Sequence, residues 1–336
     1  DTLIGNGAYK LESYTMDEEI VMVPNENYYD ADKLACKRIC FKLIADPNAK
    51  LAAMRAGELD WCDDYPTEEL DTLKAEGLFH SVPQLGTYYV NINNKVAPFD
   101  DVRVRKAFML AIDPYYLAET VTQGTYLPAT NFVGDGFIEA DGSEFSSKQV
   151  VIDRSDYAAN VAEAQKLLAE AGYPNGEGFP TVEYLYNTAD NHKKIGEALQ
   201  NMWQTELGVT VNLNNQDWNV FLQNRKDGNF QIARNGWIAD YNDPISFLDM
   251  WMTGGGNNDA QYANDDYDAL IKQAKTTTDN AERMDLLHQA EDKLIGEDNV
   301  LAPLYFYTQK YMLADGIEGM YYCPLGYFFF GYTHQA

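Results

Sequence analysis

Three side chains suited to holding a small polar ligand lie within seven residues: the cation Arg234, the large aromatic Trp237 and the anion Asp240. An apolar run at 230–233 precedes them and predicts a short strand. The Asp-Pro pair at 243–244 follows them and is typical of a helix start. Loops between a strand end and a helix are where α/β proteins usually place ligands. The sequence therefore predicts a ligand loop at this point.

The composition indicates an acidic, folded protein with two compact lobes. At 336 residues the chain is too long for one simple core, and 46% hydrophobic residues with 13% aromatics exclude a disordered chain. The formal net charge of −27 repels nucleic acids and anionic membranes, so we expect neither as a partner. The 24 tyrosines favour a binding surface, because Tyr offers stacking area and a hydroxyl. No apolar run is long enough to cross a bilayer.

The four cysteines, Cys36, Cys40, Cys62 and Cys323, lack the spacing of a metal site. None forms a CxxC pair and no His lies at zinc-ligand spacing, so we expect neither a metal nor a cofactor. In a strand, Cys36 and Cys40 would be roughly 13 Å apart, too far to bond to each other. Cys62 could bond to one of them from a neighbouring strand, and the alternative is that all remain free thiols.

Residues 1–85 predict an incomplete α/β layer that forms part of a first lobe. The elements expected there are strands 8–14, 18–24, 39–44 and 59–62, and helices 47–57 and 67–76. The first of these helices has a clear start signal, since Asp46 is a good N-cap and Pro47 suits the first helical position.

Residues 86–310 predict a second lobe, and 311–336 return to the first. The elements expected in the second lobe are strands 87–93, 181–186, 209–213, 230–233 and 302–311, and helices 102–111, 161–171, 195–207, 219–226, 265–276 and 280–295. Strands that alternate with helices predict an α/β sheet. Residues 128–150 are rich in Gly, Asp and Ser and predict a long surface loop.

Four segments match the signatures of one protein group, in that group's order. They are Gly5-Asn6-Gly7-Ala8-Tyr9-Lys10, Pro98-Phe99-Asp100-Asp101-Val102-Arg103-Val104-Arg105-Lys106-Ala107, Leu168-Ala169-Glu170-Ala171-Gly172-Tyr173 and Gly236-Trp237-Ile238-Ala239-Asp240-Tyr241-Asn242-Asp243-Pro244. Together they resemble the extracytoplasmic peptide-binding proteins of ABC importers, the dipeptide- and oligopeptide-binding group. A fifth segment, Asn187-Thr188-Ala189-Asp190-Asn191-His192-Lys193-Lys194, resembles the oligopeptide-binding branch.

The resemblance implies a periplasmic-binding-protein-like α/β fold of type II, in the peptide-binding cluster, with two lobes and mixed sheets. Lobes of this kind close on a short peptide by hinge bending, and the protein delivers the peptide to a membrane permease and its ATPase. The resemblance also implies a bacterial monomer, in the periplasm or on the outer face of the cytoplasmic membrane, where a lipid anchor can hold it as a lipoprotein. Members carry an N-terminal portion that this chain lacks, so we expect a piece of a longer protein.

The resemblance also assigns groups to the two ends of a peptide. Asp240 is expected to accept hydrogen bonds from the α-ammonium group. The positions of Arg234 and His192 are expected to hold the carboxylates of peptides of different lengths. Arg225 is a further candidate for the carboxylate end, because a guanidinium can grip a carboxylate at two points.

Two aromatic residues complete the expected site. Tyr89 and Trp237 would line the cavity and pack on the ligand, and core packing is the alternative for both. In some members of the group a disulfide joins the positions of Gly86 and Ile238. Both cysteines are absent here, so we expect packing to fix the loop beside Trp237.

Other functions remain open from the residues. Members of the same group carry nickel complexes, haem or oligosaccharides, and some proteins use the fold as a sensor domain. A hydrolase would need Asp240 and Asp243 as a carboxylate pair, but Asp243 is better explained as a helix cap. No Ser-His-Asp or metal signature supports hydrolysis either, so we do not expect an enzyme.

Overall fold

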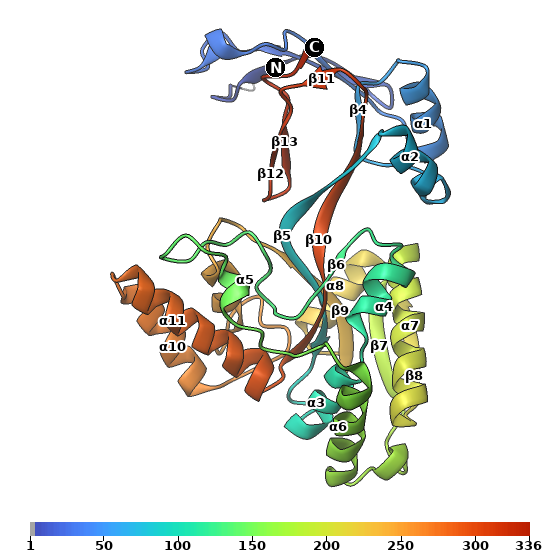
Figure 1. Cartoon of the computed structure of the whole chain (residues 1–336), viewed down its shortest axis with the longest axis vertical. Helices are drawn as coiled ribbons and strands as arrows, with labels where there is room; N and C mark the ends of the chain where they lie inside the picture. The colour runs from blue at the N-terminus through green and yellow to red at the C-terminus, as the bar shows by residue number, and fades with distance from the viewer. Residues whose placement is uncertain (1–3) are drawn as a thin grey trace. The chain divides into compact units, whose positions relative to one another are not determined.

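The computed structural model describes residues 4–336, which form two compact units. One unit comprises the chain up to Val82 together with Gln309–Ala336, and the other is Pro83–Thr308. Two long strands, β5 (Phe79–Ile92) and β10 (Leu301–Leu313), carry the chain from the first unit to the second and back (Figure 1).

The first unit contains a three-stranded antiparallel sheet and two helices. Its elements are β1 (Tyr9–Thr15), β2 (Glu19–Pro24), β3 (Ile39–Lys42), α1 (Pro47–Arg55), β4 (Trp61–Cys62), α2 (Leu70–Glu76), β11 (Ile317–Glu318), β12 (Tyr321–Cys323), β13 (Tyr327–Phe329) and β14 (His334–Gln335). The expected cap of α1 is confirmed, because the Asp46 carboxylate accepts from the Asn48 N–H at 2.8 Å. All four cysteines are free thiols, so Cys62 bonds to neither of its two candidates.

The second unit is built on a mixed sheet. Its strands lie in the order β10, β5, β9 (Ile232–Ile238), β7 (Val182–Asn187) and β8 (Val211–Gln216). The short β6 (Leu127–Pro128) pairs with β10. β5 is antiparallel to β9, whereas β7 is parallel to both β8 and β9. Three strands therefore end at the same edge of the sheet.

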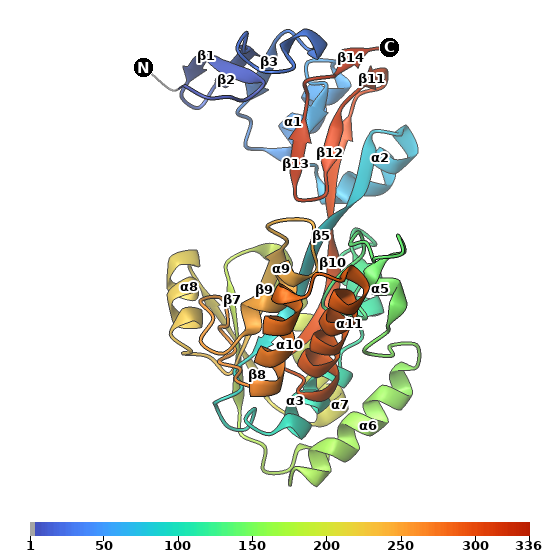
Figure 2. The same cartoon turned by 90° about the vertical axis from the view of Figure 1, so that its left-hand side faces the viewer.

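Helices cover this sheet. They are α3 (Val102–Leu110), α4 (Pro114–Tyr116), α5 (Phe145–Lys148), α6 (Tyr157–Glu170), α7 (Asp190–Leu207), α8 (Trp218–Lys226), α9 (Ile245–Leu248), α10 (Asp265–Thr276) and α11 (Asn280–Glu291). Figures 1 and 2 both show α10 and α11 lying side by side, and α3 packs on α6. The expected helix 280–295 is shorter than predicted, because a π-helical turn (Asp292–Glu297) replaces its last part.

The predicted end of the strand at 230–233 is wrong. β9 continues to Ile238, so Arg234 and Trp237 lie within the strand and only Asp240 lies in the loop beyond it. The reason is tertiary: β5 supplies pairing partners as far as Gly86, which lies opposite Ile238. The polar pair Arg234 and Asn235 interrupts the apolar pattern, so hydrophobic periodicity alone ends the strand too early.

The segment 128–150 is also more than a surface loop. Its side chains Phe132, Phe137 and Phe145 are fully buried. Phe132 packs edge-on against Phe247 of α9, with ring centres 5.2 Å apart. The Gly, Asp and Ser residues between the phenylalanines set the turns, but the aromatic rings anchor the segment in the core of the second unit.

Tyr307 fills the space above two glycines of the β5–β9 pair, so this part of the core has no room for extra atoms. A Cβ added at Gly86 would lie 2.6 Å from the Tyr307 ring, and one added at Gly236 would overlap its hydroxyl. Both strands therefore need glycine where they face Tyr307.

Gly236→Ala should lower the free energy of unfolding by about 1–3 kcal/mol, because overpacking a filled core forces side chains out of their preferred rotamers. Urea denaturation measures the change. Gly256→Ala is the matched control, since nothing lies within 4 Å of a Cβ added there. Equal effects of the two substitutions would contradict this packing argument.

Candidate functional site

Arg234 lies within β9, level with the last residues of β7, and is buried, with 8% of its surface exposed. Its Nε donates to the Oδ1 of Asn187, the last residue of β7, at 2.7 Å. The guanidinium carbon lies 5.2 Å from the centre of the Phe221 ring and 5.6 Å from that of Trp218. No carboxylate in the described part of the chain pairs with this cation. An arginine that is shielded but not neutralised is suited to an anionic ligand.

His192 lies beside Arg234 in the first turn of α7. Its Nδ1 is 3.2 Å from the hydroxyl of Tyr88, and the two rings are 5.5 Å apart. Burial, assisted by the charge of Arg234, lowers the pKa of His192 to about 4. His192 is therefore neutral at neutral pH, and it can meet an anionic group as a hydrogen-bond donor but not as a second cation.

The register of β5 against β9 decides which aromatic residues reach Arg234. Tyr89 lies opposite Asn235 and Tyr88 opposite Gly236, and residues directly opposite share a face of the sheet. Successive residues alternate between faces, so Tyr88 shares a face with Arg234 and Tyr89 does not. The Arg234 guanidinium accordingly lies 5.9 Å from the centre of the Tyr88 ring.

Tyr89 instead belongs to the core. It is fully buried, and its ring packs edge-on against Phe132 at 5.2 Å and Trp251 at 5.8 Å. The structure thus does not bring Tyr89 together with Arg234, and Tyr88 takes that place. Sequence reasoning missed Tyr88 because the choice between adjacent tyrosines depends on strand register, which no local pattern gives.

Arg225 already has partners. Its Nε donates to the Asp259 carboxylate at 2.6 Å, and one terminal nitrogen donates to Asn235 Oδ1 at 2.7 Å. Both side chains of the ion pair are largely buried. Because removing one partner of a buried pair leaves the other charge uncompensated, this contact constrains Arg225 strongly. Arg225 therefore differs from Arg234, whose charge has no carboxylate beside it.

Asp240 and Asp243 have opposite environments although they are three residues apart. The Asp243 carboxylate accepts from both terminal nitrogens of Arg283, at 2.8 and 2.9 Å, and from the Ile245 N–H. Its expected structural role is confirmed. Asp240 is exposed, and its backbone N–H donates to the Ser246 hydroxyl at 3.0 Å. Its carboxylate forms no ion pair with any described residue, which leaves it open to a cationic ligand group.

Trp237 on β9 is half-buried and lies opposite Thr87, three residues before Asp240 and on the other face of the sheet from Arg234. Its indole Nε1 is shielded from solvent and has no hydrogen-bond acceptor among residues 4–336. A shielded N–H without an acceptor is costly, so this indole is suited to donate to a bound group. Ile238 beside it packs against Gly86, where a Cβ would lie 3.1 Å from the Ile238 Cγ1.

Features of other site types do not appear in the described residues. Nowhere in 4–336 do three His, Cys, Asp or Glu side chains lie together as metal ligands. No helix in the same range is both long and apolar enough to cross a membrane.

Comparison with known proteins shows which family the chain that carries these groups resembles. Residues 1–259 match the model of a family described as bacterial extracellular solute-binding proteins, family 5, middle. An oligopeptide-binding protein of Bacillus subtilis is 35% identical over 95% of this chain, and a dipeptide-binding protein of the same organism is 35% identical over 97%. This chain spans about 59% of the length of either relative.

Solved structures agree with the sequence comparison. The oligopeptide-binding protein of Haemophilus influenzae, in complex with the peptide RPPGFSPFR, is similar with a TM-score of 0.75 at 32% identity. That likeness covers 96% of this chain and 62% of the other. The unliganded open form of a periplasmic murein tripeptide-binding protein gives a TM-score of 0.76 at 33% identity, over 96% of this chain and 61% of the other. The expected type II periplasmic-binding fold, with a mixed sheet, is confirmed.

His192 should titrate with a midpoint near pH 4 when its ring protons are followed by NMR. Arg234→Gln should raise that midpoint, because the charge of Arg234 opposes protonation. Arg103→Gln removes the same charge from a residue that does not act on His192 and is the matched control. An unchanged midpoint in Arg234→Gln would contradict the proximity of the two groups.

The same pKa shift gives a sign for stability. The unfolded chain binds the His192 proton near pH 6.5, whereas the folded chain binds it only near pH 4. The contribution of neutral His192 to the free energy of unfolding is therefore fully present above about pH 6.5, and it is lost as the pH falls toward about 4.

Proposed function

Since this chain belongs to the family 5 bacterial extracellular solute-binding proteins, we propose that it captures short peptides for an ABC importer. One observation carries the proposal: a single strand and its following loop present an Arg234 guanidinium and an Asp240 carboxylate that no described residue neutralises. A peptide zwitterion has the complementary charges at its two ends. Backbone contacts and captured termini allow binding that tolerates many side chains.

The proposed roles follow from the contacts of each residue. Asp240 accepts from the peptide α-ammonium, Arg234 holds the carboxylate, and neutral His192 adds a hydrogen bond at that end. We place the indole of Trp237 near the Asp240 end of the peptide, because it lies on the other face of the sheet from Arg234. Tyr88 supports Arg234 and His192 from the sheet.

We assign Tyr89 and Arg225 to the layer of residues behind the groups that hold the peptide. Tyr89 packs in the core behind β5, and Arg225 is fixed by Asp259. Their ligand contacts would require rearrangement of those packed groups, so we assign them a smaller effect on affinity than Asp240 and Arg234.

The proposed setting is that of the relatives. We propose an extracytoplasmic monomer that works with a membrane permease and an ATPase, and that a lipid anchor can hold at the outer face of the membrane. Relatives named for peptide binding at 35% identity support peptides over other solutes. The pairing of Asp243 with Arg283 argues against a pair of catalytic carboxylates with Asp240, so we propose binding without chemistry.

Asp240→Ala should weaken peptide binding by about 10–100-fold, the size expected for losing a hydrogen bond to a charged group. Isothermal titration of the protein at the length its gene encodes, with an equimolar mixture of di- to pentaalanine, measures the change. Asp266→Ala removes the same charge from a side chain that is 86% exposed, and serves as the control. Unchanged affinity in Asp240→Ala would show that Asp240 does not hold the ammonium group.

The peptides recovered after binding should be intact. Mass spectrometry after prolonged incubation with the same mixture tests this expectation, and cleavage products above those of a protein-free sample would contradict binding without chemistry.

A further inference from the structure

Glu291, at the end of α11, is a buried carboxylate that pairs with no cation among residues 4–336. It is 1% exposed, and its Oε1 accepts from the backbone N–H groups of Phe132 at 2.9 Å and Val133 at 2.7 Å. Burial raises the pKa of Glu291 to about 7, although the two N–H bonds oppose that rise. The other titratable groups that act with it are Asp292 on the same helix segment and Tyr267 of α10. Burying this charge is costly, so the contact it makes has a structural purpose.

The backbone that Glu291 holds leads to the strand pair of the candidate site. The Phe132 carbonyl accepts from the Thr87 hydroxyl at 2.8 Å in a fully buried contact. Thr87 lies directly opposite Trp237 in the β5–β9 register, on the same face of the sheet. Fixing Phe132 therefore fixes the strand segment on which Trp237 rests.

A second path runs from Phe132 to the loop of Asp240. The Phe132 ring packs edge-on against Phe247 of α9 at 5.2 Å. Phe247 follows Ser246, whose hydroxyl accepts from the Asp240 N–H at 3.0 Å. The position of Phe132 thus bears on Trp237 and on the Asp240 loop, two of the groups that the proposed function places at the ligand.

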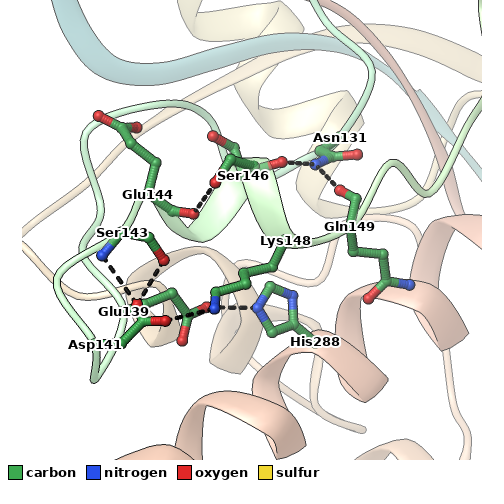
Figure 3. A network of polar contacts seen from close by, with 10 residues as sticks. Asn131, Glu139, Asp141, Ser143, Glu144, Ser146, Lys148, Gln149 and His288 are labelled. Atoms are coloured by element: carbon green, nitrogen blue, oxygen red, sulfur yellow. Dashed lines mark hydrogen bonds and ion pairs between the residues drawn. The ribbon is translucent and has the colours of Figure 1, made fainter.

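α11 attaches to the same segment at another point (Figure 3). His288 lies one turn before Glu291; its Nε2 is 2.6 Å from the Glu139 carboxylate, and its ring stacks on Phe145 with centres 3.8 Å apart. Figure 3 also shows the ion pair of Lys148 with Asp141 in the turn beside them. The Lys148 Nζ lies 2.7 Å from the Asp141 Oδ2. The segment is therefore pinned on α11 on both sides of its central turn, which leaves little freedom at Phe132.

From these contacts we infer that Glu291 is a positioning residue for the ligand site. It holds Phe132 and Val133, and through Thr87 and Phe247 it fixes Trp237 and the Asp240 loop in their binding geometry. The inference rests on the proposed function only for the identity of the ligand. The linkage between Glu291 and the loop is a property of the protein alone, and can be measured without any ligand.

Hydrogen exchange in the 336-residue chain measures that linkage. Glu291→Ala should speed exchange by about tenfold or more at the Phe132 and Val133 amides, which lose their acceptor, and should also speed it across 237–246. Glu291→Gln keeps a carbonyl oxygen as acceptor, so it should restore most of the protection in both places. Glu282→Gln, an exposed substitution on the same helix, is the control and should change neither.

Peptide affinity provides the second readout. In the protein at its encoded length, Glu291→Ala should raise the Kd for trialanine by about tenfold, and Glu291→Gln by less than about threefold. Faster exchange at 132–133 with no change at 237–246 would overturn the inference. If the wild-type protein binds trialanine, an equal Kd for Glu291→Ala would also overturn it. If Glu291→Ala does not fold, equal exchange and Kd in Glu291→Gln and in a Glu291→Met variant, which lacks the acceptor, would overturn it.

A different result would refute the proposed function. A wild-type protein that binds no peptide would refute the proposed ligand, whereas the exchange comparison would still decide whether Glu291 positions the loop.

Discussion

The antiparallel pairing of β5 with β9 is the constraint on which the second unit depends. The register runs from Gly86 opposite Ile238 to Ile92 opposite Ile232. It decides on which of the two faces of the sheet each paired side chain lies. Arg234 thereby meets the end of the parallel strands, while Trp237 faces the segment that α11 holds. A slip of one residue would turn the Arg234 cation into the aromatic core around Phe132, so burial on both faces specifies the register.

Electrostatic compensation separates structural charges from available ones. Arg225 and Asp243 each have an opposite charge within hydrogen-bonding distance, at Asp259 and Arg283. Arg234 and Asp240 have none among the described residues. A protein with a formal net charge of −27 contains many carboxylates that could neutralise an arginine, so the isolation of Arg234 depends on the aromatic and amide groups around it. Those groups shield the cation without cancelling its charge, which keeps it available for a carboxylate in a poorly solvated place.

Local patterns predicted most elements, and tertiary contacts decided the details of the site. Capping signals placed the start of α1, and periodicity placed the helices with one strongly apolar face. The end of β9 and the choice of Tyr88 over Tyr89 beside Arg234 could not be predicted, because both depend on pairing with a distant strand. Glu291 gave no signal at all: a glutamate near a helix end usually reaches solvent, and only the fold reveals its buried partners. The fold class followed from motifs spread along the chain, whereas the surroundings of each motif residue required coordinates.

The recognition of a peptide ammonium group by Asp240 is the central claim, and blocking that group tests it most directly. Isothermal titration of the protein at its encoded length should show trialanine binding about 10–100-fold more tightly than N-acetyl-trialanine. In Asp240→Asn the two peptides should differ by less than about threefold, because the amide no longer offers a charge to the ammonium group. Equal affinity of the wild-type protein for both peptides would contradict the account.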